Sequence, residues 1–279
     1  MEREFKIIDL VKMTRGTHFH AQVLRGDTHG RPIDPFLGID HAWTSAPTFP
    51  PHPHAGFSAV SYVFEDSDTG ILNRDSLGTR NLIEPGGLHW TTAGRGIVHE
   101  EVPAQTGKMS HMLQIFVNLS ADTQQIAPFT LSLQPGDVPV TRVPGARIRI
   151  PLGRFLDHVS PLRPPTDVGL LDILLEEGAR IELPVPEGMV TFVMPIRGTL
   201  SVDNETFDAD ISGIPVFDAV GRSRVVTLTA GEAPAQAVVF SGKPLRQPVY
   251  WQGSMAMVSP AALLHATTEF RLGKFGALD

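Results

Sequence analysis

Two short couples of side chains, His52-Pro53-His54 and His99-Glu100-Glu101, have the residue types and the spacing of a metal site. Residues two apart in an extended strand lie on the same face, so each couple can present both side chains to one point. Together they offer three imidazoles and one carboxylate, which suit Fe, Mn, Ni, Co or Cu better than Ca or Mg. Four protein ligands on an octahedral ion leave two positions for water, substrate or dioxygen, as a reactive metal requires.

Other polar side chains of the chain have simpler interpretations. His18-Phe19-His20 has the same spacing, but a single pair of this kind is weak evidence and we interpret it as structural. His111 is either a fifth ligand or, as we favour, a side chain of the pocket wall or a partner of a ligand. Arg74 and Arg95 are expected to make structural hydrogen bonds.

Composition excludes several classes of protein. The 279 residues are 42% hydrophobic and 19% charged, and the net charge of -7 gives no basic footprint for nucleic acid. The absence of cysteine removes disulfides, thiolate metal sites and cysteine nucleophiles. The charged first six residues carry no apolar signal core and no run has membrane-spanning length, so a cytoplasmic protein without membrane contact is expected.

Turn-forming residues are frequent and separate short apolar runs, which predicts an all-β fold. There are 26 Gly and 24 Pro, and strand-like runs recur at 57–64, 88–92, 109–119, 147–150, 169–175, 189–196, 198–202, 214–217 and 237–240. Asp203-Asn204 is a plausible hairpin turn. Residues 128–144 resemble a linker, and the flanking halves resemble weak repeats, so duplicated β-sandwiches are the leading architecture. The halves are assigned as residues 1–134 and 135–279.

One helix is predicted near the end of the chain. Ser259 is a good N-cap, Pro260 fits the first helical position, and the run to Ala266 favours a helix that Gly273 would end. We expect this helix to pack across one sandwich. Met255 and Met257, just before it, are expected in the core.

Several segments together resemble the pirin family. They are residues 51–57 (Pro-His-Pro-His-Ala-Gly-Phe), residues 90–101 with the specific run Ala-Gly-Arg-Gly-Ile-Val-His at 93–99, residues 113–119, and residues 271–276. The resemblance implies two tandem cupin domains, of which only the N-terminal one holds metal, most often iron. Carried over by position, the ligands are His52, His54, His99 and Glu101. The implied ion is Fe(II), with Mn, Ni, Co, Cu or Zn as alternatives.

The resemblance also implies three alternative functions. Some relatives cleave the flavonol quercetin with dioxygen and release carbon monoxide, and there Glu101 would be both ligand and general base toward an aromatic substrate. Others resemble iron-dependent, redox-sensing regulators that bind a transcription factor or a metabolic enzyme, so a protein partner is an alternative. The third function is an inactive cupin that keeps its metal for stability.

This chain departs from the common family pattern around the expected ligands. Ala55, Ser58 and Ala59 stand where the family commonly has Arg, Glu and Thr, His89 stands where Gln is usual, and Asn73 stands where His is common. The departures concern side chains around the ligands, so they bear on the substrate more than on metal binding.

Overall fold

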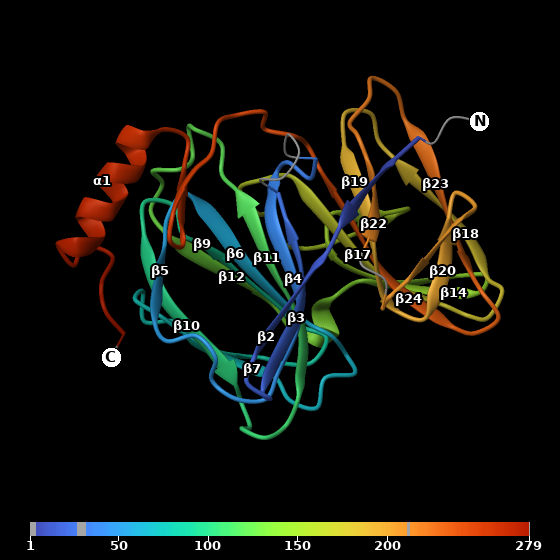
Figure 1. The fold of residues 1–279 in the computed structure, drawn as a ribbon, viewed down its shortest axis with the longest axis horizontal. Coiled ribbons are helices and arrows are strands. Elements are labelled where there is room, and N and C mark those ends of the chain that lie inside the picture. Colours follow the sequence, from blue (N-terminus) through green and yellow to red (C-terminus); the bar gives the residue numbers. More distant parts are fainter. Residues whose placement is uncertain (1–3, 27–31, 211–212, 279) are drawn as a thin grey trace.

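Two β-barrels of similar construction make up the molecule (Figure 1). The structure is a computed structural model that describes residues 4–26, 32–210 and 213–278. Each barrel combines a seven-stranded and a four-stranded sheet, and the described residues contain one α-helix, close to the C-terminus. The predicted all-β fold is therefore confirmed. No helix in these ranges is long and apolar enough to cross a membrane.

The first barrel contains both histidine couples in its smaller sheet. The seven-stranded sheet runs, edge to edge, β12 (Phe129–Leu133), β9 (Leu88–Thr92), β6 (Phe57–Val63), β11 (Ser110–Asn118), β4 (Phe36–Thr44), β3 (Phe19–Arg25) and β2 (Val11–Arg15). The four-stranded sheet runs β5 (His52–His54), β10 (Ile97–Pro103), β7 (Ile71–Asp75) and β8 (Arg80–Ile83). The two couples therefore lie on β5 and β10, which are neighbours.

The second barrel repeats this order strand for strand. Its larger sheet runs β1 (Lys6–Asp9), β22 (Gly213–Phe217), β19 (Val190–Arg197), β24 (Ala235–Gly242), β17 (Val168–Leu175), β14 (Ala146–Leu152) and β13 (Val140–Val143). Its smaller sheet runs β18 (Arg180–Val185), β23 (Arg224–Ala230), β20 (Thr199–Val202) and β21 (Glu205–Asp208). Asp203 and Asn204 both have positive φ between β20 and β21, which confirms the predicted hairpin turn.

The predicted linker at residues 128–144 is wrong. Strand β12 pairs with β9 of the first barrel, and β13 pairs with β14 of the second. Only a short 3-10 turn, η1 (Pro135–Asp137), and its flanking residues lie between them. The Pro-Gly pair at 135–136 is a genuine turn signal, but the residues on either side pair as edge strands of two different sheets.

The two ends of the described chain exchange places between the barrels. Strand β1, at the start, completes the sheet of the second barrel, whereas β25 (Tyr250–Gln252), β26 (Met255–Met257) and α1 (Pro260–Arg271) lie against the first (Figure 1). A second small hairpin joins β15 (Arg154–Phe155) to β16 (His158–Val159). The assignment of domains to 1–134 and 135–279 stays a prediction. Strand pairing shows in addition that each end of the described chain contacts the barrel formed mainly by the other half.

The helix α1 forms as its sequence signals predict. Ser259 Oγ accepts a hydrogen bond from Ala262 N at 3.1 Å, so the N-cap is confirmed. The helix packs Leu263 and Ala266 against the buried Met255 and Met257, which confirms these methionines as core residues. This small core also includes Val98 of β10, so the helix supports the strand that carries His99.

The two larger sheets share one apolar core between the barrels. Phe36 of the first barrel packs edge-on against Phe192 of the second, with ring centroids 5.3 Å apart. Tyr62 donates a hydrogen bond at 2.7 Å across this interface to the carboxylate of Asp172. Because this core occupies one face of the first larger sheet, the opposite face is left to enclose the site together with β5 and β10.

Candidate metal centre

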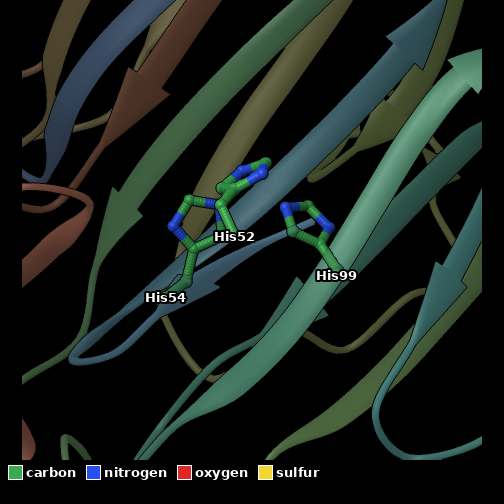
Figure 2. Close-up of side chains that lie close together, drawn as sticks. All are labelled: His52, His54 and His99. Carbon is green, nitrogen blue, oxygen red and sulfur yellow. The ribbon is translucent and has the colours of Figure 1, made fainter. Parts of the chain in front are cut away.

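Three imidazole rings meet where β5 and β10 run side by side. In this antiparallel pair His99 lies opposite His52, and His54 is two positions along β5 on the same face. The three ring centroids are each 4.7 Å from the other two, and one nitrogen of each ring lies within 4.8 Å of the others. Figure 2 shows the rings gathered around a common space. The structure thus brings together the three histidines that spacing predicted.

Backbone carbonyls fix the orientation of two of these rings. His52 Nδ1 is 2.9 Å from Pro50 O, and His54 Nδ1 is 3.0 Å from Ser254 O. A carbonyl accepts only from a protonated nitrogen, so in both residues Nδ1 holds the proton and Nε2 has a free lone pair. Carbonyl-oriented imidazoles of this kind are the usual ligands of transition metals in proteins.

Burial keeps the rings of His54 and His99 in the neutral form that a metal requires. Desolvation lowers the pKa of His54 to about 3, and it lowers the pKa of His99 well below its ordinary value. Neighbouring imidazoles lower both further. Converging imidazole nitrogens at these separations fit a divalent transition metal, so the three residues have the donor chemistry of a candidate metal site.

Glu101 lies in the same cavity but outside the group of three nitrogens. Ser61 Oγ donates to Glu101 Oε2 at 2.6 Å and is 3.0 Å from Gln114 Oε1. Burial raises the pKa of Glu101 to about 7, and the Ser61 hydrogen bond opposes that shift. Ligation by His52, His54, His99 and Glu101 stays a prediction, and all four side chains line the same cavity.

The cavity beside the three histidines has a volume of about 600 Å³. Its wall is mainly aromatic and aliphatic, with Phe49, Phe57, Phe116, Leu37, Ile71, Met13 and Met112 among the lining residues. Two arginines also line it: Arg25 forms an ion pair with Asp40, and Arg15 lies over the Phe49 ring, 4.5 Å from its centroid. A cavity of this size and lining suits a flat aromatic molecule.

His111 is not part of this cavity, so its predicted place in the pocket wall or beside a ligand is wrong. Side chains alternate along β11, and Met112, Gln114 and Phe116 line the cavity while His111 faces the other way. There its Nε2 is 2.7 Å from His41 Nε2 and its Nδ1 is 2.8 Å from Asp66 Oδ1.

The interpretation of His18, His20 and Arg74 as structural agrees with their positions, whereas the predicted hydrogen bonds of the Arg95 side chain stay a prediction. His20 stacks on the Trp43 ring, with centroids 4.7 Å apart, and neither His18 nor His20 belongs to the three-histidine group. Arg74 donates to the Glu100 carboxylate at 2.8 Å.

Four residues of the site were missed by sequence reasoning. Ser61 donates to Glu101 and lies beside Gln114, Ser254 orients His54, and Asp75 lies directly across from His99 in the β7–β10 pair. Only Asp75 had a usable signal, because Asn73-Arg74-Asp75 has the same two-residue spacing on a strand and ends at a turn. Ser254 acts through its backbone carbonyl, and because every residue has one, the residue type at position 254 gives no signal.

Comparison with known proteins agrees with this architecture. The family model described as Pirin matches residues 18–117, and the model of the Pirin C-terminal cupin domain matches residues 170–276. Mouse pirin is 33% identical over 254 residues, covering 88% of this chain and 86% of the relative. A Pseudomonas aeruginosa protein provisionally named quercetin 2,3-dioxygenase is 31% identical over 269 residues, covering 91% of this chain and 90% of that protein.

A solved structure extends the likeness to the whole fold. Quercetin 2,3-dioxygenase from Acinetobacter baumannii superposes with a TM-score of 0.86 at 24% identity, covering 99% of both chains. With both family models matched in order along one chain, the expected pair of cupin domains is confirmed. The chain belongs to the pirin family.

Proposed function

We propose that this protein is a metal-dependent dioxygenase that opens an aromatic substrate of the flavonol type with dioxygen, releasing carbon monoxide. The observation that carries the proposal is the triangle of imidazoles, 4.7 Å on each side, set in the wall of a largely apolar cavity of about 600 Å³. The Pseudomonas relative, whose name refers to the same reaction, supports it.

The residues of the site have distinct roles in this proposal. His52, His54, His99 and Glu101 hold the ion, of which Fe(II) is our first choice. When bound, such an ion acidifies a hydroxyl of the substrate and mediates electron transfer to dioxygen. Glu101 accepts the proton of the substrate hydroxyl at its carboxylate, which Ser61 holds in place at 2.6 Å. Phe49, Phe57 and Phe116 hold the aromatic rings and exclude water.

Oxygen consumption tests the proposal directly. Protein loaded with Fe(II) is mixed with quercetin, oxygen uptake is followed with an electrode, and carbon monoxide is measured in the headspace. We expect metal-dependent uptake with carbon monoxide release, and neither from the His99→Ala variant, which should fold but lose its metal. No uptake from wild-type protein shown to be metal-loaded would contradict the proposal. It would instead favour a metal-dependent regulator that binds a protein partner.

The role of Glu101 is tested by the isosteric Glu101→Gln variant. The amide keeps the volume and can still accept from Ser61, but it takes up no proton at neutral pH. Turnover should fall by about 100-fold or more, the scale of a lost general base, while metal content falls far less. Equal losses of turnover and of metal content would show that Glu101 acts only as a metal ligand and not as a general base.

A further inference from the structure

The third imidazole of the site, His99, and three buried polar side chains near it each have one polar atom without a hydrogen-bond partner. Asp75, Asn73, His89 and His99 are each at most 4% exposed. Within the described ranges, Asp75 Oδ2, Asn73 Oδ1, His89 Nε2 and His99 Nδ1 have no hydrogen-bond partner. An unpaired buried polar atom costs about 1–3 kcal/mol, so four of them in one place indicate a common partner.

The strands place these four groups together. Asp75 lies directly opposite His99 in the β7–β10 pair, and Asn73 lies opposite Glu101 two positions away on the same face. Asn73 Nδ2 donates to Asn81 Oδ1 at 3.0 Å, and Asn81 Nδ2 is 3.4 Å from His89 Nδ1. This chain of amides connects His89 on β9 to Asn73 on β7, and so to the Asp75–His99 pair.

The existing hydrogen bonds decide which of the unpaired atoms donate. Ser132 Oγ lies 2.9 Å from His89 Nδ1, and with that nitrogen as acceptor the proton of His89 sits on Nε2. Asn73 uses its amide nitrogen on Asn81, so its unpaired oxygen is an acceptor. Asp75 Oδ1 already accepts from Leu77 N and Thr79 N, at 2.9 and 3.0 Å, and only Oδ2 is left. These bonds make His89 Nε2 a donor and the oxygens of Asn73 and Asp75 acceptors, and His99 Nδ1 is a second donor when His99 Nε2 binds the ion.

We infer that Asp75 is a positioning residue for His99, acting through a buried water that binds among Asp75, Asn73, His89 and His99. One water accepts from the two imidazoles and donates to the carboxylate and the amide, which matches its full capacity of four hydrogen bonds. His99 thereby keeps its proton on Nδ1 and turns the lone pair of Nε2 to the ion, as the Pro50 and Ser254 carbonyls do for His52 and His54. The inference rests on the proposed metal site, though not on its reaction.

The Asp75→Asn variant isolates this role. Asparagine keeps an oxygen for Leu77 N and Thr79 N but replaces Oδ2 with an amide group that can only donate. The matched control is Asp203→Asn, because Asp203 Oδ1 accepts from Thr227 N at a turn of the second barrel, at 2.8 Å. Affinity for Co(II) is measured by competition with a chelator for wild type and both variants, and folding is checked by circular dichroism.

We expect the affinity for Co(II) to fall 10- to 100-fold in Asp75→Asn, the usual effect of losing a partner of a metal ligand, and to stay within about twofold in Asp203→Asn. Equal affinities in Asp75→Asn and wild type would overturn the role of Asp75 while leaving the metal site intact. Failure of the wild type to bind Co(II) would instead overturn the metal site and this inference with it.

A second measurement needs no variant at Asp75 and decides the question if Asp75→Asn does not fold. Proton–nitrogen correlation spectra of the histidine rings are recorded on the Zn(II)-loaded wild type, with His99 assigned by its loss in His99→Leu. We expect a proton on His99 Nδ1 that exchanges slowly with solvent. A metal-bound Nδ1, or a proton on Nε2, would overturn the inference.

Discussion

The smaller sheets of the two barrels have the same strand order and register, but their inward-facing residues are polar in the first barrel and apolar in the second. In the first, His99 pairs with His52 on one side and with Asp75 on the other; in the second, Leu228 pairs with Ile181 and Val202 in the same way. Aligned on these pairs, the inward residues of the two sheets correspond as His52 to Ile181, His54 to Leu183, His99 to Leu228, Glu101 to Ala230, Asp75 to Val202 and Asn73 to Leu200.

Each of the six residues in the second barrel belongs to its buried apolar core. Apolar side chains fill the interior of the second barrel at these positions. In the first barrel the polar residues line a cavity, and three of them point their imidazole nitrogens toward one another. The strand framework therefore does not determine the chemistry. The inward side chains of one small sheet do, and His54 and Glu101 among them are held by hydrogen bonds from other parts of the chain.

The largest effect is expected from placing a site residue in the second barrel. Leu228→His removes a side chain that is 0% exposed and puts an imidazole without partners into an apolar core. The free energy of unfolding should fall by about 4 kcal/mol, from lost packing and an unpaired polar group. Urea denaturation measures it, and a change below about 1 kcal/mol would show that the second interior tolerates polar groups.

The reverse exchange should remove the metal and keep the fold. His99→Leu gives the first barrel the residue of the second, with a similar volume, so the free energy of unfolding of the metal-free protein should fall by no more than about 3 kcal/mol, the cost of leaving a buried polar group without its partner. Affinity for Co(II) should fall at least about 100-fold, which is about 2.8 kcal/mol. Retention of the ion in a competition with chelator would remove His99 from the ligand set.

A smaller effect is expected in the pH dependence of stability of the metal-free protein. Burial lowers the pKa of His54 to about 3, so as the pH falls below 6.5 the unfolded chain binds a proton that the folded one refuses. His54 therefore costs stability as the pH falls from 6.5 toward 3. Glu101, with its pKa raised to about 7, favours the folded state at low pH and opposes this effect.

Comparison of the His54→Leu variant with the wild type separates the contribution of His54 from that of Glu101. Between pH 6.5 and 5, the unfolding free energy of His54→Leu should rise relative to wild type by about 1.5 kcal/mol. Urea denaturation at several pH values in the presence of a chelator measures the gap. A gap that is constant with pH would show that His54 titrates normally in the folded state.

The sequence was sufficient for the parts of this comparison that depend on local spacing. The couples at His52 and His99 needed only the two-residue period of a strand, and the helix at Pro260 needed only its cap. The halves could be recognised as similar because both alternate short strands with glycine turns.

Other features depend on pairing between distant segments, which spacing does not report. His111 follows β10 closely in sequence, but strand alternation turns it to the opposite face of the sheet, toward His41. Ser254 orients His54 from 200 positions away. Residues 128–144 were interpreted as a linker because of the turn signal at Gln134-Pro135-Gly136-Asp137; their pairing with β9 and β14 in two different barrels could not be predicted from spacing.

The exchange of chain ends between the barrels has a consequence for biosynthesis. During translation the first barrel emerges from the ribosome long before residues 250–278, yet Ser254 and the helix α1 complete its rim. Strand β1 is synthesised even earlier, but it cannot pair until β22 has been synthesised. Such long-range pairing makes folding slow, so we expect metal loading to be an event of the finished chain rather than of the nascent one.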